Sequence, residues 1–200
     1  MLTWDIPGSV HMEELKKFLQ RIHLLEPDLM ENFLSFWKAA EFKKGDILTR
    51  VGEVDRYFYF MTEGIQKAFF EKNGKFHVIA FTISPAFTCI PESFLTQRPS
   101  HYSLECISDS KALKISYQKM EELASQSHEI EKLIRKANEN VLAGLVVRYH
   151  QILAYSMEER FRDFVSRSPH LLNLIPHKDL ASYLGMDPTN FSKLYNSIRI

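Results

Sequence analysis

The residues best suited to specific recognition chemistry follow the pair Asp187-Pro188 near the end of the chain. Their polar side chains recur at helical spacing: Thr189, Asn190, Ser192, Lys193 and Asn196. An asparagine amide can make two hydrogen bonds to adenine, and a lysine can reach guanine acceptors or a phosphate. Aspartate is a good helix N-cap and proline fits the first helical position, so the pair predicts a helix start. The pattern favours a short helix that presents these side chains to DNA.

A preceding helix must hold this one in place. It is predicted from Lys178 to Leu184, and Gly185-Met186 forms a tight turn between the two helices. Helix, glycine-containing turn and second helix is the plan of the helix-turn-helix, whose second helix enters the major groove. Lys178 is therefore a further predicted DNA contact.

If the protein binds DNA, its basic residues must be concentrated near the predicted helix-turn-helix. The chain has 25 basic and 25 acidic residues, so its composition does not indicate a strongly basic nucleic-acid binder. Residues 176–200 carry three basic and two acidic residues, and a plain helical hairpin without DNA binding is the alternative. Two copies in a dimer would double this charge, and Arg160, Arg162 and Arg167 supply more.

Composition narrows the class of protein. A length of 200 residues fits one large domain or two small ones, and 45% hydrophobic residues are typical of a globular chain. No apolar run approaches the ~20 residues that span a bilayer, and the first residues lack a secretory signal. We therefore expect a cytoplasmic protein with no membrane partner. The two cysteines, Cys89 and Cys106, are expected to be buried thiols, and they cannot complete a four-cysteine cluster.

The middle of the chain has the pattern of a small β domain. From about residue 41, turn residues alternate with short aromatic and β-branched runs, which indicates a sandwich or barrel. Asn73-Gly74 is the clearest turn, because both residues tolerate the positive φ of a type I′ hairpin. That turn would pair Phe70 with His77.

A long helix without internal proline is predicted within residues 126–155. About 25 helical residues extend about 38 Å, more than packing on a small β domain requires. Its wide apolar face, with a glycine that permits close approach, predicts a partner helix. The predicted dimer contacts are Ile134, Ala137, Val141, Gly144, Leu145 and Ile152. Packing of the whole helix on its own β domain is the alternative.

A β domain, a long helix and a helix-turn-helix in this order resemble the Crp/Fnr family of bacterial transcription regulators. In the first domain the resemblance rests on Lys44-Gly45-Asp46-Ile47-Leu48, Gly52-Glu53, Phe60 with Gly64, and Gly74. In the second it rests on the run from Lys178 to Lys193. The resemblance covers about residues 10–200.

The resemblance implies an α+β fold in three parts. Residues 1–125 would form a cyclic-nucleotide-binding-like double-stranded β-helix (β-roll) with flanking helices, and residues 126–155 the dimerisation helix. Residues 156–200 would form a winged-type helix-turn-helix, coupled to the sensor by a hinge near Tyr155-Ser156. The implied protein is a homodimeric regulator that binds double-stranded DNA and has no enzymatic activity, with RNA polymerase as a further candidate partner.

The implied effector pocket departs from the family pattern. Its members here would be Ile90, Glu92, Arg98, Ser100, His101, Tyr102 and Leu145. Cyclic-nucleotide binders of the family pair a short-helix Gly-Glu with a nearby Arg-Ser, but Ser100-His101 stands at the Arg-Ser position. A buried phosphodiester requires a paired donor, which only Arg98, displaced by two residues, could supply. We expect no cofactor, and a small effector other than cAMP bound in the usual way.

Two other classes of protein compete with this interpretation. A cyclic-nucleotide regulatory module responsive to cAMP or cGMP would explain residues 10–155 but not the capped helices after them. A metal-dependent enzyme on a double-stranded β-helix would need clustered histidines, whereas His77, Glu92 and His101 are scattered. No metal site is therefore expected, and a haem ligated by His77 or His101 is disfavoured.

Overall fold

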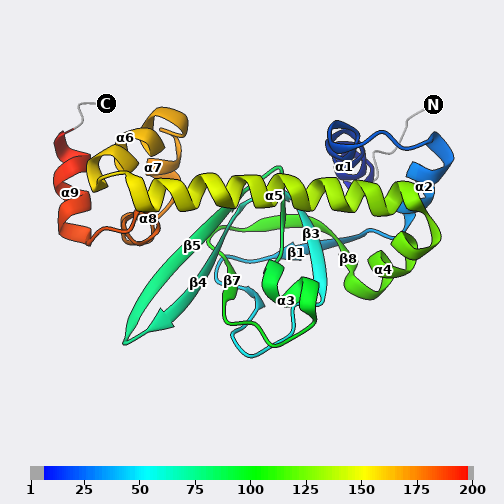
Figure 1. Ribbon diagram of the computed structural model, residues 1–200, viewed down its shortest axis with the longest axis horizontal. Helices are drawn as coiled ribbons and strands as arrows, with labels where there is room; N and C mark the ends of the chain where they lie inside the picture. Colours follow the sequence, from blue (N-terminus) through cyan, green and yellow to red (C-terminus); the bar gives the residue numbers. More distant parts are fainter. Residues whose placement is uncertain (1–6, 198–200) are drawn as a thin grey trace. The chain divides into compact units, whose positions relative to one another are not determined.

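The computed structural model describes residues 7–197, and its elements run in the order of the colours in Figure 1. The helices are α1 (Pro7–Ile22), α2 (Pro27–Ser35), α3 (Pro91–Thr96), α4 (Tyr117–Gln126), α5 (His128–Ala154), α6 (Met157–Arg167), α7 (Leu171–Leu174), α8 (His177–Leu184) and α9 (Pro188–Ser197). The strands are β1 (Lys38–Phe42), β2 (Ile47–Thr49), β3 (Tyr57–Glu63), β4 (Ile65–Lys72), β5 (Lys75–Ile83), β6 (Ala86–Thr88), β7 (Ser103–Cys106) and β8 (Ser110–Ser116).

The chain forms two compact units. The first comprises the described part of Met1–Lys67 together with Phe81–Asn140, and the second comprises Ala68–Ala80 with the described part of Val141–Ile200. The division cuts the long helix α5 and assigns the tip of the β4–β5 hairpin to the C-terminal helices, so it differs from the contiguous parts that the sequence predicts.

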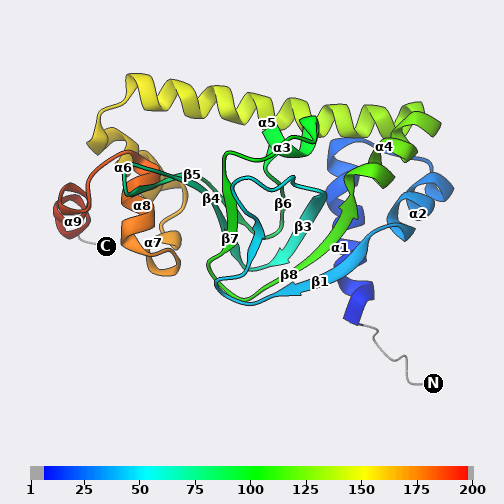
Figure 2. The ribbon, with the colours of Figure 1, turned by 90° about the horizontal axis from the view of Figure 1, so that it is seen from below.

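The strands form two four-stranded sheets, as a β-roll requires. Their orders are β1-β8-β3-β6 and β2-β7-β4-β5. β3 and β8 are antiparallel, with Phe60 opposite Leu113. Both of these side chains are buried in the main core, which the sheet shares with α1 and α2. In Figure 2, α1 lies beside β1, β3 and β8, which confirms the predicted flanking helices.

The predicted hairpin turn is confirmed. Asn73 has a φ of 54° and Gly74 a φ of 71°, the two positive values that a type I′ turn needs. The rings of Phe70 and His77 stack across the hairpin with centroids 4.9 Å apart.

The second unit is built around α6 to α9. Phe161, Leu180 and Phe191 are buried within it, as are Leu171 and Leu172 of α7. The sequence analysis did not predict α7. Within residues 7–197, no strand lies beyond β8, so the wing strands of a winged helix-turn-helix are not part of the described chain.

Gly64 tests how closely the β-roll is packed. Its φ is +96°, and an added Cβ would lie 2.7 Å from the Asp109 carbonyl oxygen and would clash with the Ser110 side chain. Gly45 has a similar φ of +91° but no atom within 4 Å of such a Cβ. We therefore expect Gly64→Ala to lower the free energy of unfolding by about 1–3 kcal/mol more than Gly45→Ala does. Urea unfolding of both variants measures the difference, and equal losses would contradict the packing described.

Candidate DNA-reading helix and effector pocket

The turn between α8 and α9 depends on Gly185. This residue follows α8 in the left-handed conformation, with φ of 69°, and its N–H donates to Ser182 O. Met186 N donates to Ala181 O at 3.0 Å, which completes the termination of α8. Glycine is the residue that adopts this conformation at least cost, so the predicted turn has its physical cause in the sequence.

Asp187 caps the start of α9. Its Oδ1 accepts hydrogen bonds from the backbone N–H groups of Thr189 and Asn190 at 2.9 and 3.0 Å. Its Oδ2 accepts a 2.5 Å bond from the Asn190 side-chain amide. The cap confirms the predicted helix start, and it also engages the amide that the sequence analysis assigned to base reading.

Burial of Phe191 sets the rotation of α9. This ring is fully buried, and it meets the ring of Phe161 edge-to-face with centroids 5.4 Å apart. Because helical side chains repeat every 3.6 residues, the polar positions then face outward. Thr189, Ser192, Lys193 and Asn196 are exposed, as is Lys178 on α8, whereas Asn190 is half-buried. Ser192 donates to Pro188 O, so the side chains with the greatest freedom are Thr189, Lys193 and Asn196.

The three arginines of α6 have partners inside the unit. Arg162 pairs with Glu158, and Arg167 pairs with Asp163. Arg160 donates to Leu184 O at 2.8 Å and to Tyr155 O at 2.6 Å. A cation at the carbonyl end of a helix satisfies orphan acceptors and opposes the helix dipole, so Arg160 stabilises the ends of α5 and α8. The sequence analysis had treated these arginines only as charge for DNA.

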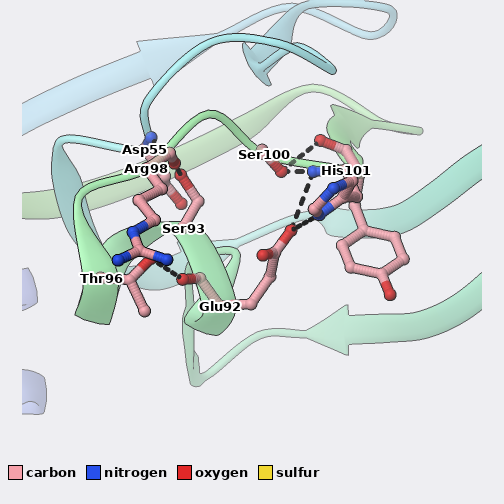
Figure 3. A network of polar contacts seen from close by, with 8 residues as sticks. Asp55, Glu92, Ser93, Thr96, Arg98, Ser100 and His101 are labelled. Carbon is pink, nitrogen blue, oxygen red and sulfur yellow. Dashed lines mark hydrogen bonds and ion pairs between the residues drawn. The ribbon is translucent and has the colours of Figure 1, made fainter.

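The residues predicted for an effector pocket include Glu92 of α3 and members of the loop that follows (Figure 3). Glu92 Oε1 accepts a hydrogen bond from the backbone N–H of His101 at 2.8 Å and lies 3.0 Å from His101 Nδ1. The backbone hydrogen bond, with the imidazole contact behind it, lowers the pKa of the Glu92 carboxyl. These two predicted pocket residues are therefore brought together, and they are paired with each other.

A buried network fixes the base of this loop. Ser93 Oγ accepts from Asp55 N at 2.9 Å and donates to Arg98 O at 2.6 Å. Asp55 is itself buried and accepts from Ile90 N, and its burial raises the pKa of its carboxyl. Asp55 thus satisfies a donor at the start of α3, which has no side-chain cap of its own.

Of the remaining predicted pocket residues, Ser100 and Tyr102 flank His101 in the loop, and the rings of His101 and Tyr102 lie edge-to-face with centroids 6.5 Å apart. Ile90 and Ser100 are buried, and Ser100 Oγ bonds the backbone of Tyr102. Arg98 is exposed, and Figure 3 shows its guanidinium beside Thr96, away from the Glu92–His101 pair. Leu145 lies on the C-terminal half of α5, in the second unit. A cyclic phosphate beside Glu92 would thus meet a carboxylate without an adjacent arginine side chain.

Other types of site have little support in the described chain. Within residues 7–197 there is no cluster of three or more histidine, cysteine or acidic side chains that could hold a metal ion. Cys89 and Cys106 are free thiols, and burial raises the pKa of both. None of the helices in this range is long and apolar enough to cross a bilayer.

The Glu92–His101 contact predicts a measurable titration. We expect Glu92 to titrate below the ordinary glutamate value of about 4.3. The His101→Ala variant should raise this pKa only part of the way, because the backbone N–H at position 101 remains and makes the largest contribution. Carbon-detected NMR titration of the Glu92 carboxyl measures both values. An unchanged pKa in His101→Ala would contradict a contribution from the imidazole.

Comparison with known proteins agrees with this architecture. Residues 39–127 match the cyclic nucleotide-binding domain family. No curated protein matches the chain by sequence.

Solved structures match over most of the chain. FixK2 from Bradyrhizobium japonicum is 14% identical with a TM-score of 0.69, covering 80% of this chain and 83% of its own. The c-di-GMP responsive global regulator CLP of Xanthomonas campestris is 15% identical with a TM-score of 0.63, covering 86% and 90%. The catabolite activator protein of Thermus thermophilus is 16% identical with a TM-score of 0.56, covering 88% and 84%. Residues 39–127 therefore resemble the cyclic nucleotide-binding domain family, and the chain as a whole shares the α+β fold of these solved structures.

Proposed function

We propose that this protein is a homodimeric transcription regulator that binds double-stranded DNA through α8 and α9. The observation that carries the proposal is the orientation of α9. Its apolar side is buried through Phe191, and its outer side presents Thr189, Lys193 and Asn196 from a capped helix after a glycine turn.

The second element of the proposal is a dimer formed through α5. Large apolar side chains lie exposed on the C-terminal half of this helix at spacings of three and four: Leu142, Leu145, Tyr149 and Ile152. Leu145 is 56% exposed and Tyr149 64% exposed, which is unusual for a contiguous stripe on a single protomer. The spacing is that of a coiled-coil seam, so a second copy of α5 is the partner we infer.

This seam differs in part from the contacts proposed from the sequence. Leu145 and Ile152 lie on it, and Val141 is exposed beside it. Ile134 instead packs against the core of its own unit, and Gly144 lies towards the other side of the helix. The proposed seam adds Leu142 and Tyr149, because spacing alone does not tell which apolar side chains of a helix are covered by its own chain.

The proposed dimer supplies what one recognition helix lacks. One helix-turn-helix brings little net positive charge, and two copies double it. Two recognition helices about 34 Å apart would contact successive major grooves on one side of the duplex. In this mechanism an effector in the β-roll would change the relative pose of the two helices. It could shift the equilibrium between the two states only by the difference between its affinities for them.

The effector proposed for the β-roll is a small molecule other than cAMP bound in the usual way. The pairing of Glu92 with His101, and the position of Arg98 beside Thr96, support this part of the proposal. Small molecules retained through native purification and identified by mass spectrometry would test it directly. Recovery of stoichiometric cAMP would contradict it.

Lys193→Ala tests DNA reading. We expect this variant to weaken binding to DNA from upstream of the protein's own gene by about tenfold and to reduce the salt slope of binding by about one. Fluorescence anisotropy at several salt concentrations measures both quantities. Lys132→Ala removes the same charge from the N-terminal half of α5 and should leave DNA affinity unchanged. Absence of DNA binding by the wild-type protein at every salt concentration would refute the proposal.

Leu145→Asp tests the seam. An aspartate there would place two like charges in the dimer interface. This should make the free energy of dimerisation less favourable by about 3–5 kcal/mol and yield monomers. Asn140→Asp adds the same charge at an exposed α5 position outside the stripe and should stay dimeric. Light scattering measures the mass of each variant. Equal masses for Leu145→Asp and the wild type would show that the seam is wrongly assigned.

A further inference from the structure

The second unit contains a cleft that the proposed mechanism does not use. We call it the α5–α8 cleft; it has a volume of about 370 Å³. Its wall includes Gly144, Val147, Arg148, Gln151, Arg167 and Tyr183. The α5 members recur at spacings of three and four, on the side of the helix turned away from the proposed seam. A cavity of this size is at the small end of those that hold metabolites.

Arg148 dominates the chemistry of the cleft. Its guanidinium lies over the ring of Tyr183, 4.0 Å from the centroid, and donates a hydrogen bond to the Tyr183 carbonyl oxygen. Its Nε is buried, yet has no hydrogen-bond partner among the described residues. A buried donor on a charged group is costly to leave unpaired, so the Arg148 guanidinium is short of acceptors within the described chain.

The charges around Arg148 also favour an anion. Burial lowers the pKa of Arg148, and the nearby Arg160 and Arg167 lower it further. The carboxylate of Asp163 accepts hydrogen bonds from Arg167 and from Gln151 Nε2, the latter at 3.0 Å. Arg160 donates to backbone carbonyl oxygens rather than to a carboxylate. The guanidinium groups of Arg160 and Arg167 therefore add positive charge near Arg148.

We propose that the α5–α8 cleft binds a small organic anion, whose phosphate or carboxylate group pairs with Arg148 and Arg167. Arginine suits both groups, because its planar fork can donate two parallel hydrogen bonds to their oxygens. Val147 and the face of Tyr183 offer an apolar wall for the rest of the ligand. The space beside Gly144 is open, since a Cβ at this position would meet no atom within 4 Å.

Such a ligand would act on the DNA-reading helices from inside their own unit. The cleft joins α5 to α8, the helix that positions α9, so an occupied cleft would favour the packing described here. This site is distinct from the β-roll pocket. Its occupancy does not depend on DNA binding, so it can be tested apart from the proposed function.

Isothermal titration calorimetry on the full chain tests the site. Pyrophosphate and citrate serve as separate phosphate and carboxylate probes, in chloride buffer at constant ionic strength. We expect saturable binding of at least one probe, with one site per chain. Gly144→Leu should weaken it by about tenfold or more by filling the cleft, and Arg148→Gln should weaken it about ten- to hundredfold by removing the charged donor. No saturable binding of either probe would overturn the proposal.

Two controls separate the cleft from general surface charge and from misfolding. Arg162→Gln removes an α6 arginine that does not line the cleft and should bind the probe as the wild type does. Gly144→Leu should keep its fold, because leucine has the higher helix propensity, and thermal melting checks this. Wild-type affinity in Gly144→Leu would overturn the proposal, as would equal losses in Gly144→Leu and Arg162→Gln.

A direct readout comes from the Nε–H group of Arg148. Its ¹H–¹⁵N signal, identified by its loss in Arg148→Lys, should shift on saturation with the probe because an anion binds the same guanidinium group. An unmoved signal at saturation would overturn the proposal. Lys193→Ala should bind the probe like the wild type even if DNA binding fails, so the two proposals can fail separately.

Discussion

The burial of one ring, Phe191, is the constraint on which the C-terminal unit depends. Phe191 packs on Phe161 and near His177, and so it fixes both the position of α9 and its rotation about its axis. A rotation by one residue, about 100°, would turn the polar positions into the core and leave them without hydrogen-bond partners. Packing and the outward display of polar side chains thus concern opposite sides of the same ten-residue helix. The Gly185 turn and the Asp187 cap hold α9 in this arrangement.

The β-roll combines a family fold with unusual local chemistry. The scaffold, with its two sheets and the short helix α3, resembles that of the cyclic nucleotide-binding domain family. Glu92, however, is occupied by the N–H and imidazole of His101, and the Ser93–Asp55 network holds the backbone of Arg98 in place. A backbone fold can persist while its binding site changes. The fold depends on buried apolar residues, whereas the site depends on a few polar side chains.

The parts that sequence predicted well are those with local physical causes. Gly185, the Asp187-Pro188 pair and Asn73-Gly74 each require a particular backbone conformation, and the structure has all three. The parts that it missed depend on contacts between distant residues. Spacing on α5 cannot tell that Ile134 packs on its own core while Tyr149 stays exposed, and neither the Glu92–His101 pair nor the Arg148–Tyr183 contact has a sequence signature. Helix α7 is a single turn, too short to leave a periodic pattern.

The hairpin tip that packs with the C-terminal helices has a consequence for how the chain is made. Ser182 of α8 accepts a hydrogen bond from Val78 N and donates one to Phe76 O, across a separation of more than a hundred residues. During synthesis the tip emerges long before its helical partner, so this unit can only close near the end of translation. A cut within α5 would also separate the β4–β5 hairpin from the C-terminal helices that it packs with. Dissection into halves, routine for two-domain regulators, would therefore need the hairpin to be grafted back or replaced.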